Sequence, residues 1–148
     1  MKVKVISLQQ PWAHLVVSLD HEGNAFKEFE TRSGKTNYRG ELYIHASNKF
    51  LFSNLELCHQ DKYFKKCMPD LSVIQTGCII GKVTLVDCVP VESLDGKISK
   101  QERTFGDYSP GRFAWVLEQP QKFIVPIPAK GALSIWDFDL KEEEVQHG

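Results

Sequence analysis

Apolar residues alternate with polar ones, or form short β-branched runs, at several places along the chain, and both patterns are typical of strands. The longest run covers residues 77–91 and contains Gly81. A glycine inside such a run indicates a bulge or a bend, as expected for a strand that curls around a barrel. The other predicted strands are residues 3–8, 39–46, 113–118, 123–128 and 135–138, and the prolines of 123–128 place it at a sheet edge or a strand end.

Two segments have the apolar spacing of helices. The first covers about residues 10–19, with Pro11 in the first turn, where the missing N–H of proline costs no hydrogen bond. The second covers about residues 48–66, whereas 26–32 is extended or irregular and 92–111 forms a polar loop. About six strands, paired in sequence, predict an α+β fold. This fold is a small mixed β-barrel with about two flanking helices, and not a doubly wound parallel sheet.

The composition is that of one ordinary globular domain. The chain has 148 residues, of which 42% are hydrophobic and 25% charged, which argues against long disorder and coiled coils. The net charge of −1 hides a gradient, because the residues up to Trp136 carry 17 basic and 14 acidic side chains, a net of +3. We therefore predict a single domain over residues 1–140 and an acidic tail over 141–148. A mildly basic body is compatible with a phosphate-bearing ligand, and the tail is either solvated or a protein-interaction segment.

No stretch approaches the roughly 18 apolar residues that span a bilayer, and residues 1–5 alternate charged and apolar side chains, unlike a signal peptide. We therefore expect a cytoplasmic protein that does not enter a membrane. The cysteines Cys58, Cys67, Cys78 and Cys88 show no C-x-x-C spacing, so we expect reduced thiols and neither a metal site nor an organic cofactor. Cys78 and Cys88 lie in apolar strand-like runs and are expected in the core.

Five motifs stand in order from about residue 5 to residue 138, nearly the whole chain. They are Ser7-Leu8-x-Gln10-Pro11-Trp12-Ala13, Lys27-x-x-Glu30-x-Arg32, Arg39-Gly40-x-Leu42-x-Ile44-His45-Ala46, the strand motif from Gly77 to Cys88, and Pro126-Ile127-Pro128-x-Lys130-Gly131 with Trp136. The ordered set resembles the ASCH domain, a branch of the PUA-like β-barrel superfamily. The resemblance implies a module that binds RNA or handles nucleotides, sometimes attached to transcription coactivators. A few such proteins resemble hydrolases, of which one bacterial group deacylates acetylcytidine and another has been described as a ribonuclease.

Lys27, Glu30 and Arg32 are the first candidate site residues. Two cations around one carboxylate can hold a phosphate or orient a base edge, and the alternative is a solvated charged strand. On a regular strand Lys27 points away from Glu30 and Arg32, because side chains alternate between the two faces. The three side chains therefore converge only if the segment bends near Phe29.

Lys27 and Glu30 are also the candidate catalytic pair, should the protein be an enzyme. The acetylcytidine hydrolases have a lysine, a threonine three residues later and a separate downstream glutamate. Here Lys27 matches the lysine, but Glu30 occupies the threonine position and Thr31 is one residue away from it. No residue is assigned to the downstream glutamate. Because Glu30 has no hydroxyl to attack an acyl carbon, its catalytic role would be that of a general base on water.

A second group, Ser7, Gln10 and Trp12, lies at a predicted strand–helix junction. Short polar groups and the free N–H groups of a first helical turn favour phosphate, and Trp12 either stacks on a base or packs in the core. His45 ends a predicted strand, where it either donates to a ligand or has a structural role. A lone histidine is no metal-ligand set.

The loop over residues 104–112 interleaves aromatic residues with glycine and arginine. Tyr108 could stack on a base and Arg112 could pair with a phosphate, or the loop could merely cover the barrel end. Arg39 is a further candidate phosphate contact. The predicted partner is RNA or a nucleoside- or nucleotide-like ligand in a polar cleft beside the barrel, and no protein partner is assigned.

Overall fold

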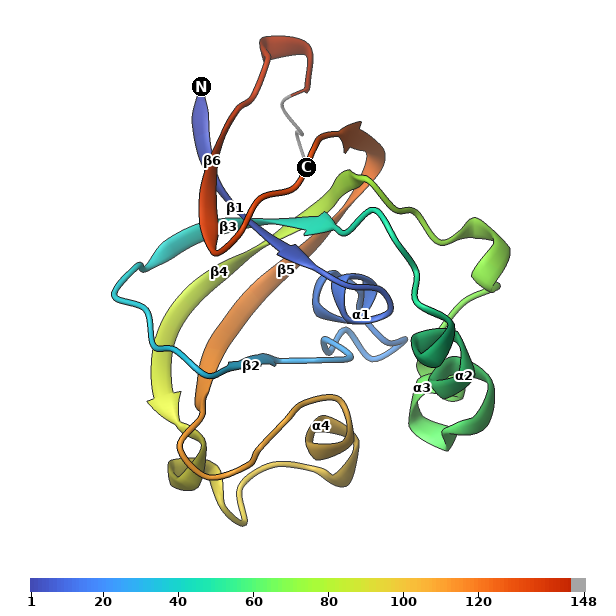
Figure 1. Cartoon of the computed structure of the whole chain (residues 1–148), viewed down its shortest axis with the longest axis vertical. Coiled ribbons are helices and arrows are strands. Elements are labelled where there is room, and N and C mark those ends of the chain that lie inside the picture. The colour runs from blue at the N-terminus through green and yellow to red at the C-terminus, as the bar shows by residue number, and fades with distance from the viewer. Residues whose placement is uncertain (145–148) are drawn as a thin grey trace.

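A computed structural model of the chain describes residues 1–144, which form one curled sheet with helices packed at its ends and inner side (Figure 1). The sheet has six strands in the order β2-β5-β4-β3-β1-β6. Only β1 and β3 are parallel, and the other neighbouring strands are antiparallel. The strands are β1 (Lys2–Leu8), β2 (Phe29–Arg32), β3 (Gly40–Ala46), β4 (Cys78–Pro90), β5 (Phe113–Pro128) and β6 (Ile135–Asp139).

The predicted α+β fold with a mixed, barrel-like sheet is confirmed, but the described part of the chain has four α-helices instead of two. They are α1 (Trp12–Val17), α2 (Phe52–Gln60), α3 (Lys62–Cys67) and α4 (Lys100–Thr104), with 3-10 turns at Leu71–Val73, Val91–Leu94 and Glu142–Glu144. The predicted helix over 48–66 is split at Asp61. Its backbone is extended there, and its carboxylate accepts hydrogen bonds from Tyr63 N and Phe64 N, which caps the start of α3.

Two further segments differ from the prediction. The loop over 92–111 contains α4, whose first turn is capped by the Ser99 hydroxyl accepting from Glu102 N at 3.0 Å. The two strands over 113–118 and 123–128 are one long strand, β5, which bends where its register against β4 shifts. Only residues 113–116 of β5 pair with β2, so the proline-containing end has a single neighbouring strand, as its prolines require.

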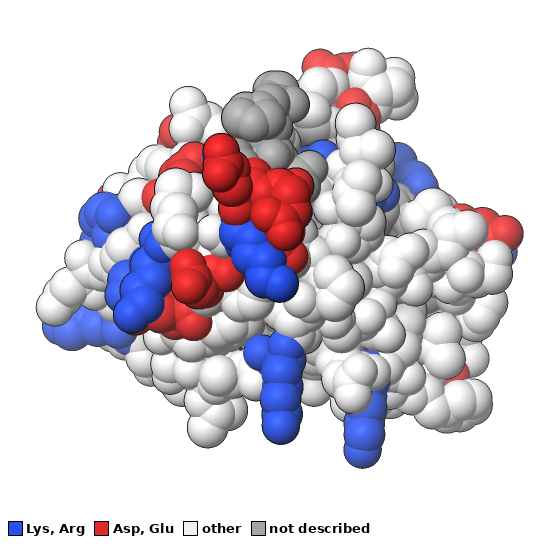
Figure 2. Space-filling view, turned by 90° about the horizontal axis from the view of Figure 1, so that it is seen from above, with Lys and Arg blue, Asp and Glu red and all other residues white. Residues whose placement is uncertain are grey.

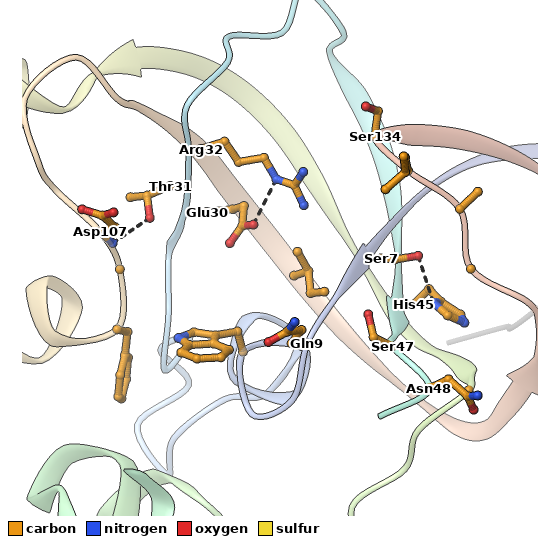
Figure 3. Close-up of a pocket in the computed structure, with 18 of the residues that line it drawn as sticks. Ser7, Gln9, Glu30, Thr31, Arg32, His45, Ser47, Asn48, Asp107 and Ser134 are labelled. Carbon is orange, nitrogen blue, oxygen red and sulfur yellow. Dashed lines mark hydrogen bonds and ion pairs between the residues drawn. The ribbon is translucent and has the colours of Figure 1, made fainter. Parts of the chain in front are cut away.

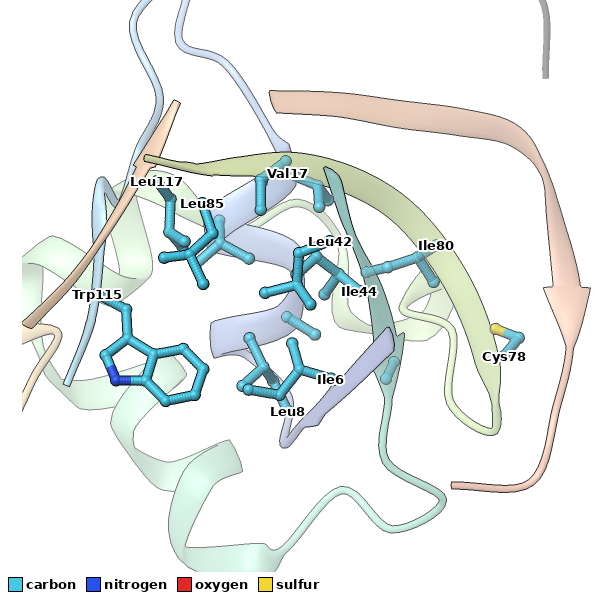
Figure 4. Packing of buried hydrophobic residues seen from close by; sticks show 14 residues of the cluster. Ile6, Leu8, Val17, Leu42, Ile44, Cys78, Ile80, Leu85, Trp115 and Leu117 are labelled. Atoms are coloured by element: carbon cyan, nitrogen blue, oxygen red, sulfur yellow. The ribbon is translucent and has the colours of Figure 1, made fainter. Parts of the chain in front are cut away.

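The largest core cluster fills the inner side of the curled sheet and packs against α1 (Figure 4). Successive residues of β1 point to opposite faces, so Ile6 joins this cluster while Val5 packs on the other face with Tyr43 and Phe123. A third cluster joins Leu15 of α1 to Phe64 of α3. These contacts fix α1, and therefore the β1–α1 junction, against the sheet.

The cysteines agree with the expected thiol chemistry. Cys78 is buried in the main cluster, and Cys88 is half-buried beside it. Both thiols, like those of Cys58 and Cys67, are free.

Charges of both signs gather where the two ends of the described chain meet (Figure 2). The N-terminal ammonium lies 3.2 Å from Asp139 Oδ1, and Lys4 Nζ lies 2.7 Å from Asp137 Oδ1. Leu140 is buried and its N–H donates to Met1 O at 2.7 Å, while the division into a domain over 1–140 and a tail over 141–148 stays a prediction. Of the predicted acidic tail over 141–148, residues 145–148 lie outside the described part.

None of the helices described here is long and apolar enough to cross a membrane, and the cytoplasmic location stays a prediction.

Candidate functional site

One pocket of about 1350 Å³ opens beside the sheet, at the junction of β1 and α1 (Figure 3). Six parts of the chain wall it: the end of β1 with the start of α1, strand β2, the end of β3 with the residues after it, Gly77 before β4, and the two loops that flank β5. Its lining combines apolar, hydroxyl, amide and charged side chains. The charged and aromatic members are Trp12, Glu30, Arg32, His45, Phe105, Asp107, Arg112 and Lys130.

Strand β2 supplies one charged wall of the pocket. The Arg32 Nε donates to Glu30 Oε2 at 3.2 Å, and the Arg32 guanidinium carbon lies 5.5 Å from the ring centre of Trp115. Trp115 is the β5 residue paired with Glu30, so the sheet register itself brings this ring to the arginine. The guanidinium is held by an ion pair and a cation–π contact, which fixes its orientation.

Lys27 supports this wall from behind and does not line the pocket. Its side chain is 1% exposed, its ammonium donates to Phe29 O, and it lies 3.9 Å from Glu30 Oε1. Lys27 precedes β2, which begins at Phe29, so strand alternation does not separate it from Glu30. Both cations therefore contact the Glu30 carboxylate, Lys27 at Oε1 from the buried side and Arg32 at Oε2.

Glu102 of α4 completes the buried side of this cluster and was missed from the sequence. Its Oε1 accepts from Glu28 N at 2.7 Å, and Oε2 has no hydrogen-bond partner among the described residues. Burial raises the pKa of Glu102, and the nearby Lys27 charge opposes that increase. The spacing Ser99-x-x-Glu102 is the sequence signal of a helix start, but it says nothing of a carboxylate turned inward.

The opposite wall contains a chain of three hydrogen bonds. His45 Nε2 lies 2.8 Å from Ala129 O, His45 Nδ1 lies 3.0 Å from Ser7 Oγ, and Trp136 Nε1 donates to Ser7 Oγ at 3.1 Å. Ser7 and His45 face each other in the register of the parallel strands β1 and β3. Burial lowers the pKa of His45 and the hydrogen bond to the Ala129 carbonyl partly offsets this, so the site favours the neutral imidazole.

Arg112 anchors the loop between α4 and β5 at the pocket rim. Its Nη2 donates to Thr31 O at 3.2 Å and its Nε to Asp107 O at 3.1 Å. The Asp107 N–H donates to Thr31 Oγ1 at 2.9 Å, so this loop and β2 are joined from both sides. Tyr108, in the same loop, does not line the pocket. Burial raises the pKa of its hydroxyl, which has no hydrogen-bond partner in residues 1–144.

Six of the predicted ligand-binding residues line this pocket and four do not. Those in the lining are Ser7, Trp12, Glu30, Arg32, His45 and Arg112; those outside it are Gln10, Lys27, Arg39 and Tyr108. Gln10 is buried, with its amide donating to Gln75 O and accepting from His14 N, so Gln9 takes its place in the lining. Arg39 donates to Thr36 O and Tyr38 O and lies 3.6 Å from Asp87.

Residues outside the predicted ligand-binding set also line the pocket. They include Thr31, Asn48, Asp107 and Lys130, together with the loop residues 131–134. Lys130 follows β5 in an exposed loop, and its position was suggested in the sequence only by the Lys130-Gly131 pair near Trp136. Among the described residues, no three His, Cys, Asp or Glu side chains come together as a metal-binding group.

The fold agrees with the relationships of this chain to known proteins. The ASCH domain family model matches residues 6–127, so the chain belongs to the ASCH domain family. Activating signal cointegrator 1 of Mus musculus and of Homo sapiens are each 30% identical to it over 145 residues, or 92% of this chain. The chain spans only 22% of the length of those relatives.

Solved structures with the same fold come from Zymomonas mobilis. The crystal structures of its ASCH protein and of a mutant of that protein each give a TM-score of 0.51 at 19% identity. Each comparison covers 95% of this chain, and 89% and 91% of the two solved chains respectively. At this identity the likeness concerns the fold.

Proposed function

We propose that the pocket binds RNA or a nucleotide-like ligand. The observation that carries this proposal is the combination, in one pocket, of an aromatic ring, a carboxylate and three cationic side chains: Trp12, Glu30, Arg32, Arg112 and Lys130. The ring offers a stacking surface for a base, the carboxylate accepts from base N–H groups, and the cations pair with phosphate. Membership of the ASCH domain family supports the same class of ligand.

Fluorescence anisotropy with a short labelled single-stranded RNA tests this proposal. We expect binding that weakens as salt rises, because phosphate contacts release counterions. Replacing Trp12 with alanine should lower the affinity by about 5- to 150-fold, the equivalent of about 1–3 kcal/mol for one stacked base. The exposed Phe52 of α2 lies outside the pocket, so Phe52→Ala is the matched control. Equal affinity in wild type and Trp12→Ala would contradict the proposal, and titration with a nucleoside monophosphate separates a mononucleotide ligand from RNA.

A second candidate function is hydrolysis of a modified nucleoside or of the RNA backbone. Glu30 favours it, because its carboxylate faces the pocket with the Lys27 ammonium behind it. In this reaction Glu30 takes a proton from water, which attacks the substrate directly. Incubation with acylated cytidine, followed by mass detection of the free nucleoside, tests it. Unchanged hydrolysis by Glu30→Gln would contradict it.

A further inference from the structure

The pocket wall opposite Glu30 holds a serine and a histidine in hydrogen-bond contact. Ser7 Oγ and His45 Nδ1 are 3.0 Å apart, and both residues line the pocket. They come from the paired parallel strands β1 and β3, where Ser7 lies directly opposite His45. Two adjacent strands of the sheet therefore fix the pair, which is labelled in Figure 3.

The neighbours of this pair determine which atoms carry the hydrogens. A carbonyl oxygen only accepts, so His45 Nε2 must carry a hydrogen and donate it to Ala129 O at 2.8 Å. In the neutral ring, Nδ1 then has a lone pair and accepts. The Trp136 indole only donates, and its Nε1–H points to Ser7 Oγ at 3.1 Å. The Ser7 hydroxyl hydrogen is left to donate to His45 Nδ1, the arrangement of a serine whose proton can pass to a histidine base.

The loop at Gly131 passes close to Ser7 and His45. A Cβ atom at position 131 would lie 2.9 Å from Ser7 Oγ and 2.8 Å from His45 Cε1. Any other residue there would press directly on the two reacting groups. Glycine lets the loop pass close to the pair while Ser7 stays part of the pocket lining.

We propose that Ser7 and His45 are a nucleophile–base pair that transfers the acyl group of a carboxylic ester bound in the pocket. Ser7 is the nucleophile, His45 Nδ1 the base, and the Ala129 carbonyl holds the ring in the required tautomer. This inference uses the same pocket as the proposed function but does not depend on which nucleotide or RNA the pocket binds. It also differs from the Glu30 route, in which water attacks without a covalent intermediate.

The reaction has two balanced halves. In the first half, Ser7 Oγ bonds to the carbonyl carbon of the ester while its proton moves to His45 Nδ1. The C–O bond to the leaving alcohol then breaks, and the alcohol takes that proton from His45. Water then attacks the acyl-serine, gives a proton to His45, and releases the carboxylic acid as Ser7 Oγ regains its hydrogen. A main-chain carbonyl carries no full charge to stabilise the imidazolium, so activated esters are the appropriate probes.

The test uses p-nitrophenyl acetate with the purified chain and follows both p-nitrophenol release and protein mass. We expect one acetyl group on the folded wild-type protein, mapped by peptide mass spectrometry to Ser7 and lost in Ser7→Ala. His45→Gln keeps a donor for the Ala129 carbonyl but has no basic nitrogen, and should slow acylation of Ser7 about a hundredfold. Matched controls are Ser53→Ala and His59→Gln, both exposed on α2 and outside the pocket.

The pH profile separates catalysis from a structural role. The rate of Ser7 acylation should rise with pH as His45 loses its proton. The midpoint of this rise should lie below the ordinary pKa of 6.5, because burial lowers the pKa of that ring. No acetyl group on Ser7 of the folded wild-type protein, or an equal rate in folded His45→Gln, would overturn the proposal. The assay contains no nucleic acid, so its failure leaves the RNA-binding result independent.

Discussion

The ammonium of Lys27 lies 3.9 Å from Oε1 of Glu30, with the lysine buried and the glutamate in the pocket wall. The cation therefore holds the pocket carboxylate from its inner side, while Arg32 contacts Oε2 from the other. A cation with almost no access to water is stabilised only by such partners. Glu30, Phe29 O and the nearby Glu102 are the groups that provide this stabilisation here.

We predict that Lys27→Met lowers the free energy of unfolding by about 3–5 kcal/mol, because it leaves buried carboxylate charge without its cation. Urea denaturation measures this change. The exposed Lys35 makes no ion pair among the described residues, so Lys35→Met is the control. Adding Glu102→Gln to Lys27→Met should restore part of the loss, since it also removes a buried carboxylate. A double variant no more stable than Lys27→Met would contradict the coupling of these two side chains.

His14 predicts a pH dependence of stability. It is 6% exposed in α1, its Nδ1 lies 3.3 Å from Ser18 Oγ, and burial together with the Lys122 charge lowers its pKa to about 4. Between pH 6.5 and 4 the unfolded chain binds a proton at this ring and the folded chain does not. The contribution of His14 to stability is therefore present above pH 6.5 and is lost as the pH falls, by roughly 3 kcal/mol in total.

Urea denaturation at several pH values, with His14→Gln beside wild type, isolates this contribution. The variant should lose less free energy of unfolding than wild type between pH 6.5 and pH 4. The raised pKa of Glu102 increases the free energy of unfolding as the pH falls. This contribution is the same in wild type and in His14→Gln, so it cancels in their difference. His21 is exposed, so His21→Gln should follow wild type, and parallel curves for wild type and His14→Gln would refute the prediction.

Local sequence patterns predicted the sheet well, because strands are built from alternation and β-branched residues that lie within one segment. The same patterns missed α4, because five residues make little more than one turn and carry no measurable apolar period. They also divided β5 in two, since its bend depends on register shifts against β4 that only pairing reveals. The apolar spacing places Asp61 inside a helix, although its extended backbone ends α2 and its carboxylate caps the start of α3.

The candidate site was predictable where neighbouring residues share one element. Glu30 and Arg32 are two apart on β2, so alternation alone places them together. The contact of Ser7 with His45, 38 residues apart, depends on the pairing of β1 with β3. Gln9 lines the pocket and Gln10 is buried in its place. The turn into α1 decides which of the two side chains enters the core, and two adjacent glutamines cannot be distinguished by residue type.

Salt dependence of RNA binding separates the cations of the pocket from those outside it. Lys130→Gln should weaken binding and reduce the slope of log affinity against log salt by about 0.7, as expected for one lost phosphate contact to a single strand. Arg39 is occupied by Asp87 and by two main-chain carbonyls outside the pocket, so Arg39→Gln should change the slope less. Lys65→Gln on α3 is the control. A larger effect of Arg39 than of Lys130 would place the phosphate contacts elsewhere.

Gly131 is the residue where a single methyl group should test the geometry of the pocket wall. Its added Cβ would meet His45 Cε1 at 2.8 Å, Ser7 Oγ at 2.9 Å and His45 Nδ1 at 3.1 Å, and His45 is itself buried and held by Ala129 O. Because the ring cannot move aside without losing that bond, we expect Gly131→Ala to lower the free energy of unfolding by about 1–3 kcal/mol.

The same variant should also displace the His45 ring, which NMR detects as a change in the chemical shifts of its Cε1–H and Nε2–H groups. Gly34→Ala is the matched control, because a Cβ there has nothing within 4 Å and the backbone needs no left-handed conformation. It should be as stable as wild type or slightly more so, since alanine restricts the unfolded chain. If Gly131→Ala behaved like Gly34→Ala in both measurements, the loop would not lie against Ser7 and His45 as described.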